Sequence, residues 1–322
     1  MRGLQGSHRV FVGLSFLFIF LFAISSLAAE KLKFGTGPKS SPIFYLPVGA
    51  AEEKGFWKQN GLEVEWVPFS AAATLHQAMA AGAINISAST VIGFIQAVAS
   101  GLPNVIVSDL QSAELFILYV RTDSPIRRPE DLKGARIGIP RLRGPAEAYA
   151  RVLGKLPGMG GEVKVVAVGG IPQLLAGLKT GIIDGVIEPA HLMVKPRLAG
   201  EIRELIYLKD SVPKDWVTHA VFARRDFTRK EPEVVKGAVR AIVQASNFLQ
   251  ENRGWAVEKI KSVSAFPEDA AKLILADYRF TQDGKLSRKG LENVRNFLIE
   301  FGIIAREKTP SAADMYVEGF TP

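Results

Sequence analysis

The chain has 322 residues, 48% of them hydrophobic, and a formal net charge of +8 at pH 7, which suits two domains of ordinary size. It has no cysteine, which excludes a disulfide framework, a thiolate metal site and a lipid-bearing cysteine. Its Lys and Arg residues are dispersed, so nucleic-acid binding is not favoured. The four histidines show no metal-ligand spacing, and we expect neither metal nor cofactor.

The N-terminus has the order of a secretory signal peptide. Arg2 and Arg9 precede an apolar run from Val10 to Leu27, and the small residues Ser26 and Ala28 follow the pattern of a cleavage site. We therefore predict a signal peptide over residues 1–28 and a periplasmic protein. The apolar run is also long enough for an uncleaved membrane anchor, which remains the alternative.

The first part of the mature chain alternates between strand and helix patterns. Lys31–Thr36 reads as a strand, and Ser41 followed by Pro42 is a candidate helix start. Glu63–Thr90 then combines a β-rich run, a turn, a short helix, a glycine stop and a second strand. That order predicts a βαβ unit, which normally builds a parallel sheet.

The same pattern returns in the middle of the chain. Glu162–Pro189 repeats Glu63–Thr90 without a gap, and Ala135–Pro145 repeats Leu32–Pro42. Any two βαβ units share an apolar pattern. Here, however, Gly35 matches Gly138 and Asn85 matches Asp184, so the agreement extends beyond the apolar positions. We expect two similar α/β lobes that face each other across a cleft.

The segments between and after the repeats predict how the chain divides. We interpret Thr122–Glu130 as a crossing into the second lobe and Val217–Arg224 as the return, so that two crossings form a hinge. Helical stretches follow from Pro232 onward, and we expect them to pack on the first lobe. This division assigns residues 29–121 and 222–322 to lobe I and residues 122–221 to lobe II.

Five runs of the mature chain form a recognisable ordered set: Pro47–Glu65, Ala78–Asn85, Asp131–Gly138, Leu178–Asp184 and Asn296–Gly302. Together they resemble periplasmic substrate-binding proteins of the NMT1/THI5 and sulfonate/nitrate/taurine type. The resemblance covers nearly all of the mature chain. It implies a type II periplasmic-binding-protein fold with a hinge and an interlobe cleft. It also implies a monomer that delivers a small, anionic or polar organic solute to the permease of an ABC transporter.

The chain departs from this family at some positions. The turn Ser70–Ala73 is often glycine-rich in relatives, and Asn85 stands where Asp is usual. The pyrimidine-synthesising enzymes of the family use a cysteine-rich motif, which a chain without cysteine cannot form. The identity of the solute does not carry over.

Candidate ligand-binding residues follow from the position of strand ends. Ligands of open α/β sheets bind at the carboxyl ends of strands, beside helix N-termini whose free N–H groups attract anions. The candidates at these ends and at the hinge are Ser40, Ser41, Ser70, Ala71, Ala72, Ser89, Thr90, Gln111, Arg141, Arg143, Gly144, Glu188 and His219. The Ser and Thr residues could instead serve only as helix caps. Arg141 and Arg143 could clamp an anion or lie in a solvated basic loop.

Enzymatic motifs were sought and not found. The chain has no Gly-x-Ser-x-Gly elbow, no phosphate-binding P-loop and no His-Glu-x-x-His motif, so we predict a binding protein that is not an enzyme. The alternatives are a secreted or membrane-tethered enzyme of pyrimidine or thiamine-precursor metabolism, and a sensor domain on the same fold.

Overall fold

The structure, a computed structural model, describes residues 31–39, 41–111, 116–142, 144–155, 158 and 161–322. The predicted signal peptide, Ser40 and Arg143 lie outside these residues. Within the described ranges, every helix is too short or too polar to cross a membrane.

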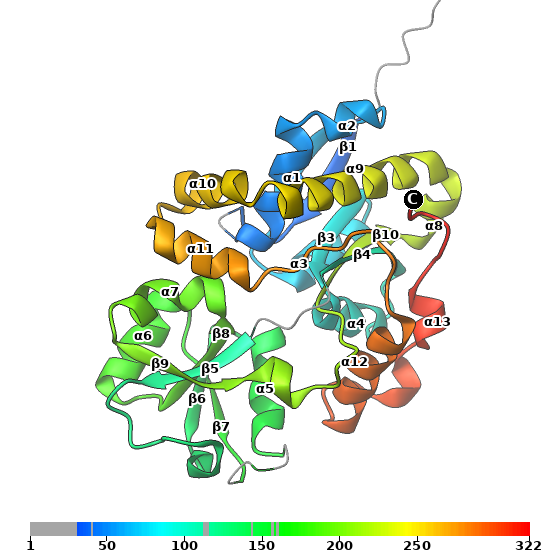
Figure 1. The fold of residues 1–322 in the computed structure, drawn as a ribbon. Helices are drawn as coiled ribbons and strands as arrows, with labels where there is room; N and C mark the ends of the chain where they lie inside the picture. Colours follow the sequence, from blue (N-terminus) through cyan, green and yellow to red (C-terminus); the bar gives the residue numbers. More distant parts are fainter. Residues whose placement is uncertain (1–30, 40, 112–115, 143, 156–157, 159–160) are drawn as a thin grey trace, which may run out of the picture.

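The first lobe is built on a five-stranded mixed sheet of order β2-β1-β3-β10-β4 (Figure 1). Strands β1, β2 and β3 run parallel, whereas β10 is antiparallel to both of its neighbours, β3 and β4. The strands are β1 (Lys31–Thr36), β2 (Glu63–Pro68), β3 (Ile86–Thr90), β4 (Asn104–Gln111) and β10 (His219–Arg224). The helices that alternate with them are α1 (Pro42–Glu53), α2 (Phe56–Gln59), α3 (Ala72–Ala80) and α4 (Val91–Ala99).

The second lobe repeats this arrangement in the order β7-β6-β8-β5-β9. Here β6 pairs in parallel with β7 and β8, and β5 is antiparallel to β8 and β9. The strands are β5 (Phe116–Arg121), β6 (Arg136–Ile139), β7 (Lys164–Ala167), β8 (Gly185–Pro189) and β9 (Ile202–Tyr207). The helices are η1 (Pro129–Leu132), α5 (Pro145–Leu153), α6 (Ile171–Thr180), α7 (Ala190–Leu198) and η2 (Leu208–Ser211). The prediction of two similar α/β lobes is confirmed.

The chain passes between the sheets earlier than predicted. Strand β5, which we assigned to lobe I, lies between β8 and β9 in the second sheet. Strand β10 lies wholly in the first sheet, so residues 219–221 belong there and not in lobe II. Each sheet thus receives its antiparallel strand from the segment that follows a crossing. The strand pattern of Phe116–Arg121 marks a strand but does not say which sheet it joins, and this is why the boundary at residue 121 was wrong.

The residues that match between the two repeats do the same structural work in each lobe. The side chain of Asn85 accepts a hydrogen bond from the backbone N–H of Lys33 at 2.9 Å, and Asp184 accepts one from the N–H of Arg136 at 2.7 Å. Both carboxamide and carboxylate therefore hold the start of the neighbouring strand. Asp184 also accepts two hydrogen bonds from the guanidinium of Arg136, whereas the bond from the N–H is the one that both lobes share.

The matched glycines Gly35 and Gly138 are explained by a close approach. A Cβ atom at Gly35 would lie 2.4 Å from Cδ1 of Ile84, and one at Gly138 would lie 2.3 Å from Cδ1 of Ile183. Real Cβ atoms do not come this close to other atoms, so both strands need glycine for the isoleucine before the next strand to pack over them.

The C-terminal segment is helical and packs largely on the first lobe, as expected. Helix α9 contacts α1 and β4, α12 contacts α4, and α13 contacts β4. Helix α11 differs, because it packs on both α10 and α7 and so reaches the second lobe (Figure 1). The bounds are α8 (Arg225–Lys230), α9 (Pro232–Glu251), α10 (Arg253–Ser264), α11 (Glu268–Ala276), α12 (Arg288–Glu300), η3 (Arg306–Lys308) and α13 (Ala312–Met315).

Candidate functional site

A cavity of about 410 Å³ lies between the two lobes, where the carboxyl ends of strands from both sheets meet. Its walls include the segments that follow β1, β2 and β3 of one sheet and β6, β7 and β8 of the other. Most ligand pockets in proteins have volumes of about 300–1,000 Å³, so this cavity suits a small molecule. The candidate residues that line it are Ser41, Ser70, Ala71, Ala72, Ser89, Thr90, Arg141, Gly144, Glu188 and His219.

The remaining candidates stand elsewhere. Ser40 and Arg143 lie outside the described residues. Gln111 is fully buried as the last residue of β4, where it pairs with His219 of β10 and forms a β-bridge with Phe280. It is absent from the described lining of the cavity. Gln111 therefore supports β10, the strand that begins with His219.

Helix capping explains one of the hydroxyl residues but not another. Thr90 caps α4, since its side-chain oxygen accepts a hydrogen bond from the N–H of Gly93 at 3.3 Å. Ser41 stands at the N-cap position of α1 but makes no side-chain cap. Its hydroxyl instead lies 3.1 Å from Nε2 of His191, which is on α7 of the other lobe. Ser41 thus connects the lobes, a role that its sequence position before Pro42 did not reveal.

A second polar contact crosses the cleft beside the first. Nη2 of Arg141, in the loop after β6, donates a hydrogen bond to the backbone carbonyl of Ser70, after β2, at 2.6 Å. Arg141 is exposed, whereas Ser41 and His191 are buried. The two contacts hold the strand ends of the two sheets together over the cavity, so the described conformation is a closed one.

Glu188 is the buried acidic residue of the cavity. It lies near the end of β8, is 4% exposed, and its Oε1 atom has no hydrogen-bond partner. Burial raises the pKa of this carboxyl to about 8, and the positive charge of Arg141 opposes the shift without reversing it. At neutral pH burial therefore keeps Glu188 largely as the neutral acid.

Two buried histidines complete the polar wall. Burial lowers the pKa of His191 to about 4, and burial together with the nearby His191 lowers the pKa of His219 to about 3. Both rings are neutral at pH 7, and Nδ1 of each has no hydrogen-bond partner. No group of His, Asp and Glu residues among the described ones could hold a metal ion. These rings can exchange hydrogen bonds with a ligand but supply no charge.

Apolar residues supply much of the remaining wall, and sequence reasoning missed them together with His191. They include Phe44, whose ring meets that of His219 edge-on at 5.7 Å, and Phe116, Ile171 and Leu192. His191 lies in the first turn of α7, directly after the end of β8. Extending the strand-end rule by one helical turn would have found it. Trp216 is buried against Phe297 and lies outside the described lining of the cavity.

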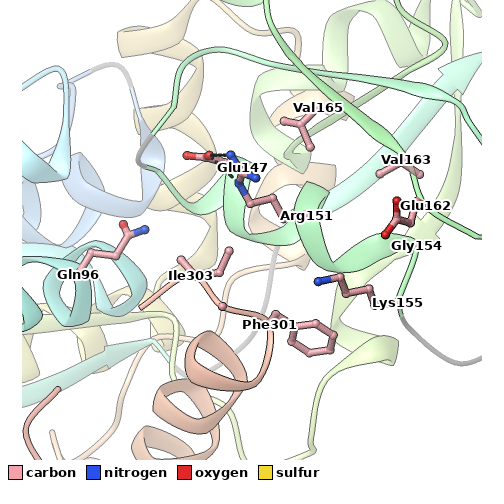
Figure 2. Close-up of a pocket in the computed structure, with 11 residues that line it drawn as sticks. Gln96, Glu147, Arg151, Gly154, Lys155, Glu162, Val163, Val165, Phe301 and Ile303 are labelled. Atoms are coloured by element: carbon pink, nitrogen blue, oxygen red, sulfur yellow. Dashed lines mark hydrogen bonds and ion pairs between the residues drawn. The ribbon is translucent and has the colours of Figure 1, made fainter. Parts of the chain in front are cut away.

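A larger crevice of about 580 Å³ opens between Gln96 of α4, α5 and the segment after α12 (Figure 2). Figure 2 shows Glu147 and Arg151 joined within α5, and their ion pair measures 2.6 Å. This crevice lies away from the carboxyl ends of the strands, and Glu147, one of the two acidic residues that line it with Glu162, is already paired. We therefore place the candidate site in the smaller cavity.

Comparisons with known proteins concern the family and the fold of the chain. A family model described as NMT1/THI5 like matches residues 44–254, well over half of the chain. The taurine-binding periplasmic protein of Escherichia coli strain K12 is 25% identical over 295 residues, which cover 84% of this chain and 87% of that protein.

Solved structures share the fold at low sequence identity. The alkanesulfonate-binding protein SsuA from Xanthomonas axonopodis pv. citri, bound to MOPS, superposes with a TM-score of 0.75 at 18% identity, covering 90% of this chain and 98% of that one. The desulfurization enzyme DSZB superposes with a TM-score of 0.65 at 15% identity, covering 90% and 97%. The predicted periplasmic-binding fold is confirmed. The same fold also serves an enzyme, so function has to be argued from the site.

Proposed function

Because the chain belongs to the NMT1/THI5 like family, we propose that it is the solute-binding component of an ABC importer and works in the periplasm. In this proposal a small polar organic solute enters the cavity, the lobes close over it, and a permease recognises the closed form. Sulfonates are the first class to test, since the similar Escherichia coli protein is named for taurine and the similar Xanthomonas protein for alkanesulfonates.

The observation that carries this proposal is the cavity itself. Polar groups and helix N-termini from both lobes converge on one cavity, and the contacts from Ser41 to His191 and from Arg141 to Ser70 cross between the lobes beside it. A solute that contacts both lobes favours closure by the additional contacts made in the closed state. Binding therefore needs no covalent chemistry.

The alternative of an enzyme has one pair of residues in its favour, because the hydroxyl of Ser41 lies 3.1 Å from Nε2 of His191 in this cavity. That contact joins the two lobes and would break when they open. It is therefore better explained as a contact of the closed state than as an activated nucleophile. We therefore propose binding without turnover.

The test is thermal unfolding of the mature chain after denaturation and refolding, which removes any solute that copurifies. A solute at a hundredfold excess over its dissociation constant should stabilise the fold by about 2.7 kcal/mol. The panel contains sulfonates, nitrate, carboxylates, aromatic acids, pyrimidines and amines. Stabilisation by one chemical class without its consumption supports the proposal. Conversion of the solute, or no stabilisation of a correctly refolded chain by any class, contradicts it.

A further inference from the structure

The chemistry of Glu188 indicates more about the solute than the fold does. A carboxyl that is 4% exposed has lost most of its hydration, and its Oε1 atom has no hydrogen bond in return. An unpaired buried polar group costs free energy, and a buried carboxylate costs far more unless a positive charge accompanies it. Among the described residues, this group therefore lacks a partner.

The protein supplies no such partner from the described residues. The titratable and charged residues that line the cavity are Arg141, Glu188, His191 and His219. Arg141 is exposed and directs Nη2 to the carbonyl of Ser70, and no ion pair or hydrogen bond connects it to Glu188. The histidine rings are held neutral by burial.

Groups that attract an anion are already present at the cavity. Helices α1, α3, α4, α5, α6 and α7 all begin at or beside the cavity. Helix N-termini carry partial positive charge and free N–H groups, so they favour an anionic group of the solute. An anion alone, however, would leave the carboxyl of Glu188 without a counter-charge.

We propose that the solute carries a protonated amine that pairs with Glu188, together with an anionic group that faces the helix N-termini. This inference rests on the proposed function and names the solute class: a small zwitterion such as an amino sulfonate or an amino acid. Ion pairing favours the carboxylate form, so capture of the ammonium group displaces the proton of Glu188 to solvent. The ammonium group keeps its own proton, and the net result is release of one proton for each solute bound.

The experiment uses pairs of compounds that differ in the amine alone. Taurine is compared with ethanesulfonate, and β-alanine with propionate, by isothermal titration calorimetry at pH 7 in two buffers of different ionisation enthalpy. We expect the amine-bearing member of at least one pair to bind at least tenfold more tightly. We also expect its binding to release close to one proton at pH 7 and clearly less at pH 8.5, because the pKa of Glu188 without solute is about 8 while the amine of the solute is still largely protonated there.

Variants locate the effect. Glu188→Gln keeps the size of the side chain and removes its charge, so it should abolish both the amine preference and the proton release while it leaves the binding of ethanesulfonate within about threefold. Glu147→Gln, at the carboxyl that pairs with Arg151 in the other crevice, is the matched control and should change neither. Proton release by the unmodified protein tests the inference even if the Glu188 variant fails to fold.

The outcomes separate the two proposals. Binding of the amine-free members as tightly as the amines, or proton release that persists in Glu188→Gln, overturns the ammonium inference and leaves the solute-binding function standing. Absence of binding by all four compounds and by every class of the unfolding panel overturns the proposed function, and the inference with it.

Discussion

The hydrogen bond from Ser41 to His191 predicts how strongly closure depends on a single hydroxyl. Both residues are buried, at 7% and 6% exposure, and their atoms lie 3.1 Å apart across the cleft. In Ser41→Ala the closed state loses this bond and leaves Nε2 of His191 without it, while Nδ1 is already unpartnered. In the open state water can solvate the ring, so the loss falls on the closed state alone.

The size of the effect follows from the two contributions. A neutral hydrogen bond contributes about 0.5–1.5 kcal/mol, and a buried polar atom left unsatisfied costs about 1–3 kcal/mol. The second value already includes the lost bond, so we expect closure to become less favourable by about 1–3 kcal/mol. Since each 1.4 kcal/mol is a factor of ten in affinity, the dissociation constant of the solute should rise about 5- to 150-fold.

The assay combines calorimetry with a distance measurement. The chain has no cysteine, so Glu52→Cys on α1 and Lys179→Cys on α6 allow two fluorophores to report the separation of the lobes. The solute-free protein with Ser41→Ala should populate the open state more than the parent. Ser100→Ala is the control, because that hydroxyl donates to the carbonyl of Gln96 within its own helical segment. Equal affinity and equal lobe separation in the Ser41 variant and the control would refute the role of this bond in closure.

Three further predictions address the second contact, the packing of the strands and the response to pH. Arg141→Ala should weaken solute binding about three- to tenfold in calorimetry, because an exposed charged hydrogen bond contributes about 1 kcal/mol. The control Arg151→Ala removes an ion pair within α5 and should leave solute binding unchanged. Equal effects of the two variants would contradict the bridging role of Arg141. Gly138→Ala should lower the free energy of unfolding in urea by about 1–3 kcal/mol, because the new methyl group clashes with Ile183. The double variant Gly138→Ala with Ile183→Val should lose less stability than the sum of the two single variants. Strict additivity would argue against this clash. Burial lowers the pKa values of His76, His191 and His219 to about 3, 4 and 3, whereas histidine in an unfolded chain has a pKa of about 6.5. The unfolded state therefore binds more protons than the folded state, and stability is lost as the pH falls from 6.5 toward 4. The raised pKa of Glu188 stabilises the folded state as the pH falls from about 8 to 4.5, but it is one group against three. Urea unfolding should therefore show that the free energy of unfolding falls by at least about 2 kcal/mol between pH 7 and pH 5. Constant stability over that range would contradict the burial of these rings.

The repeat in the sequence was informative because the matched residues of the two copies make the same contacts within their own βαβ units. Gly35 and Gly138 are each required by the isoleucine that packs on them, and Asn85 and Asp184 each hold the neighbouring strand. Such requirements lie within one βαβ unit, a few tens of residues long. A pattern of residues can therefore state them without knowledge of the rest of the fold.

Assignments that depend on distant partners were less secure. The strand-like run Leu115–Arg121 falls in lobe I of our division, but β5 pairs in the second sheet with β8 and β9, whose residues lie about 70–90 positions away in the sequence. Arg141 was predicted without knowledge of its acceptor, the carbonyl of Ser70. The division of the remaining residues between the lobes and the role of the cavity residues stay predictions.

The sequence by itself determined the α/β class, the two similar lobes and the strand ends at which a ligand site could form, since these follow from short-range periodicity and from where strands stop. Only the tertiary structure decided that Ser41 faces His191 and that Gln111 is absent from the described lining of the cavity. It also decided that Glu188 is buried with no hydrogen-bond partner for Oε1 among the described residues. Burial and hydrogen-bond partnership depend on how the two lobes approach each other. That approach brings together residues about 150 positions apart, and no local pattern in the chain encodes it.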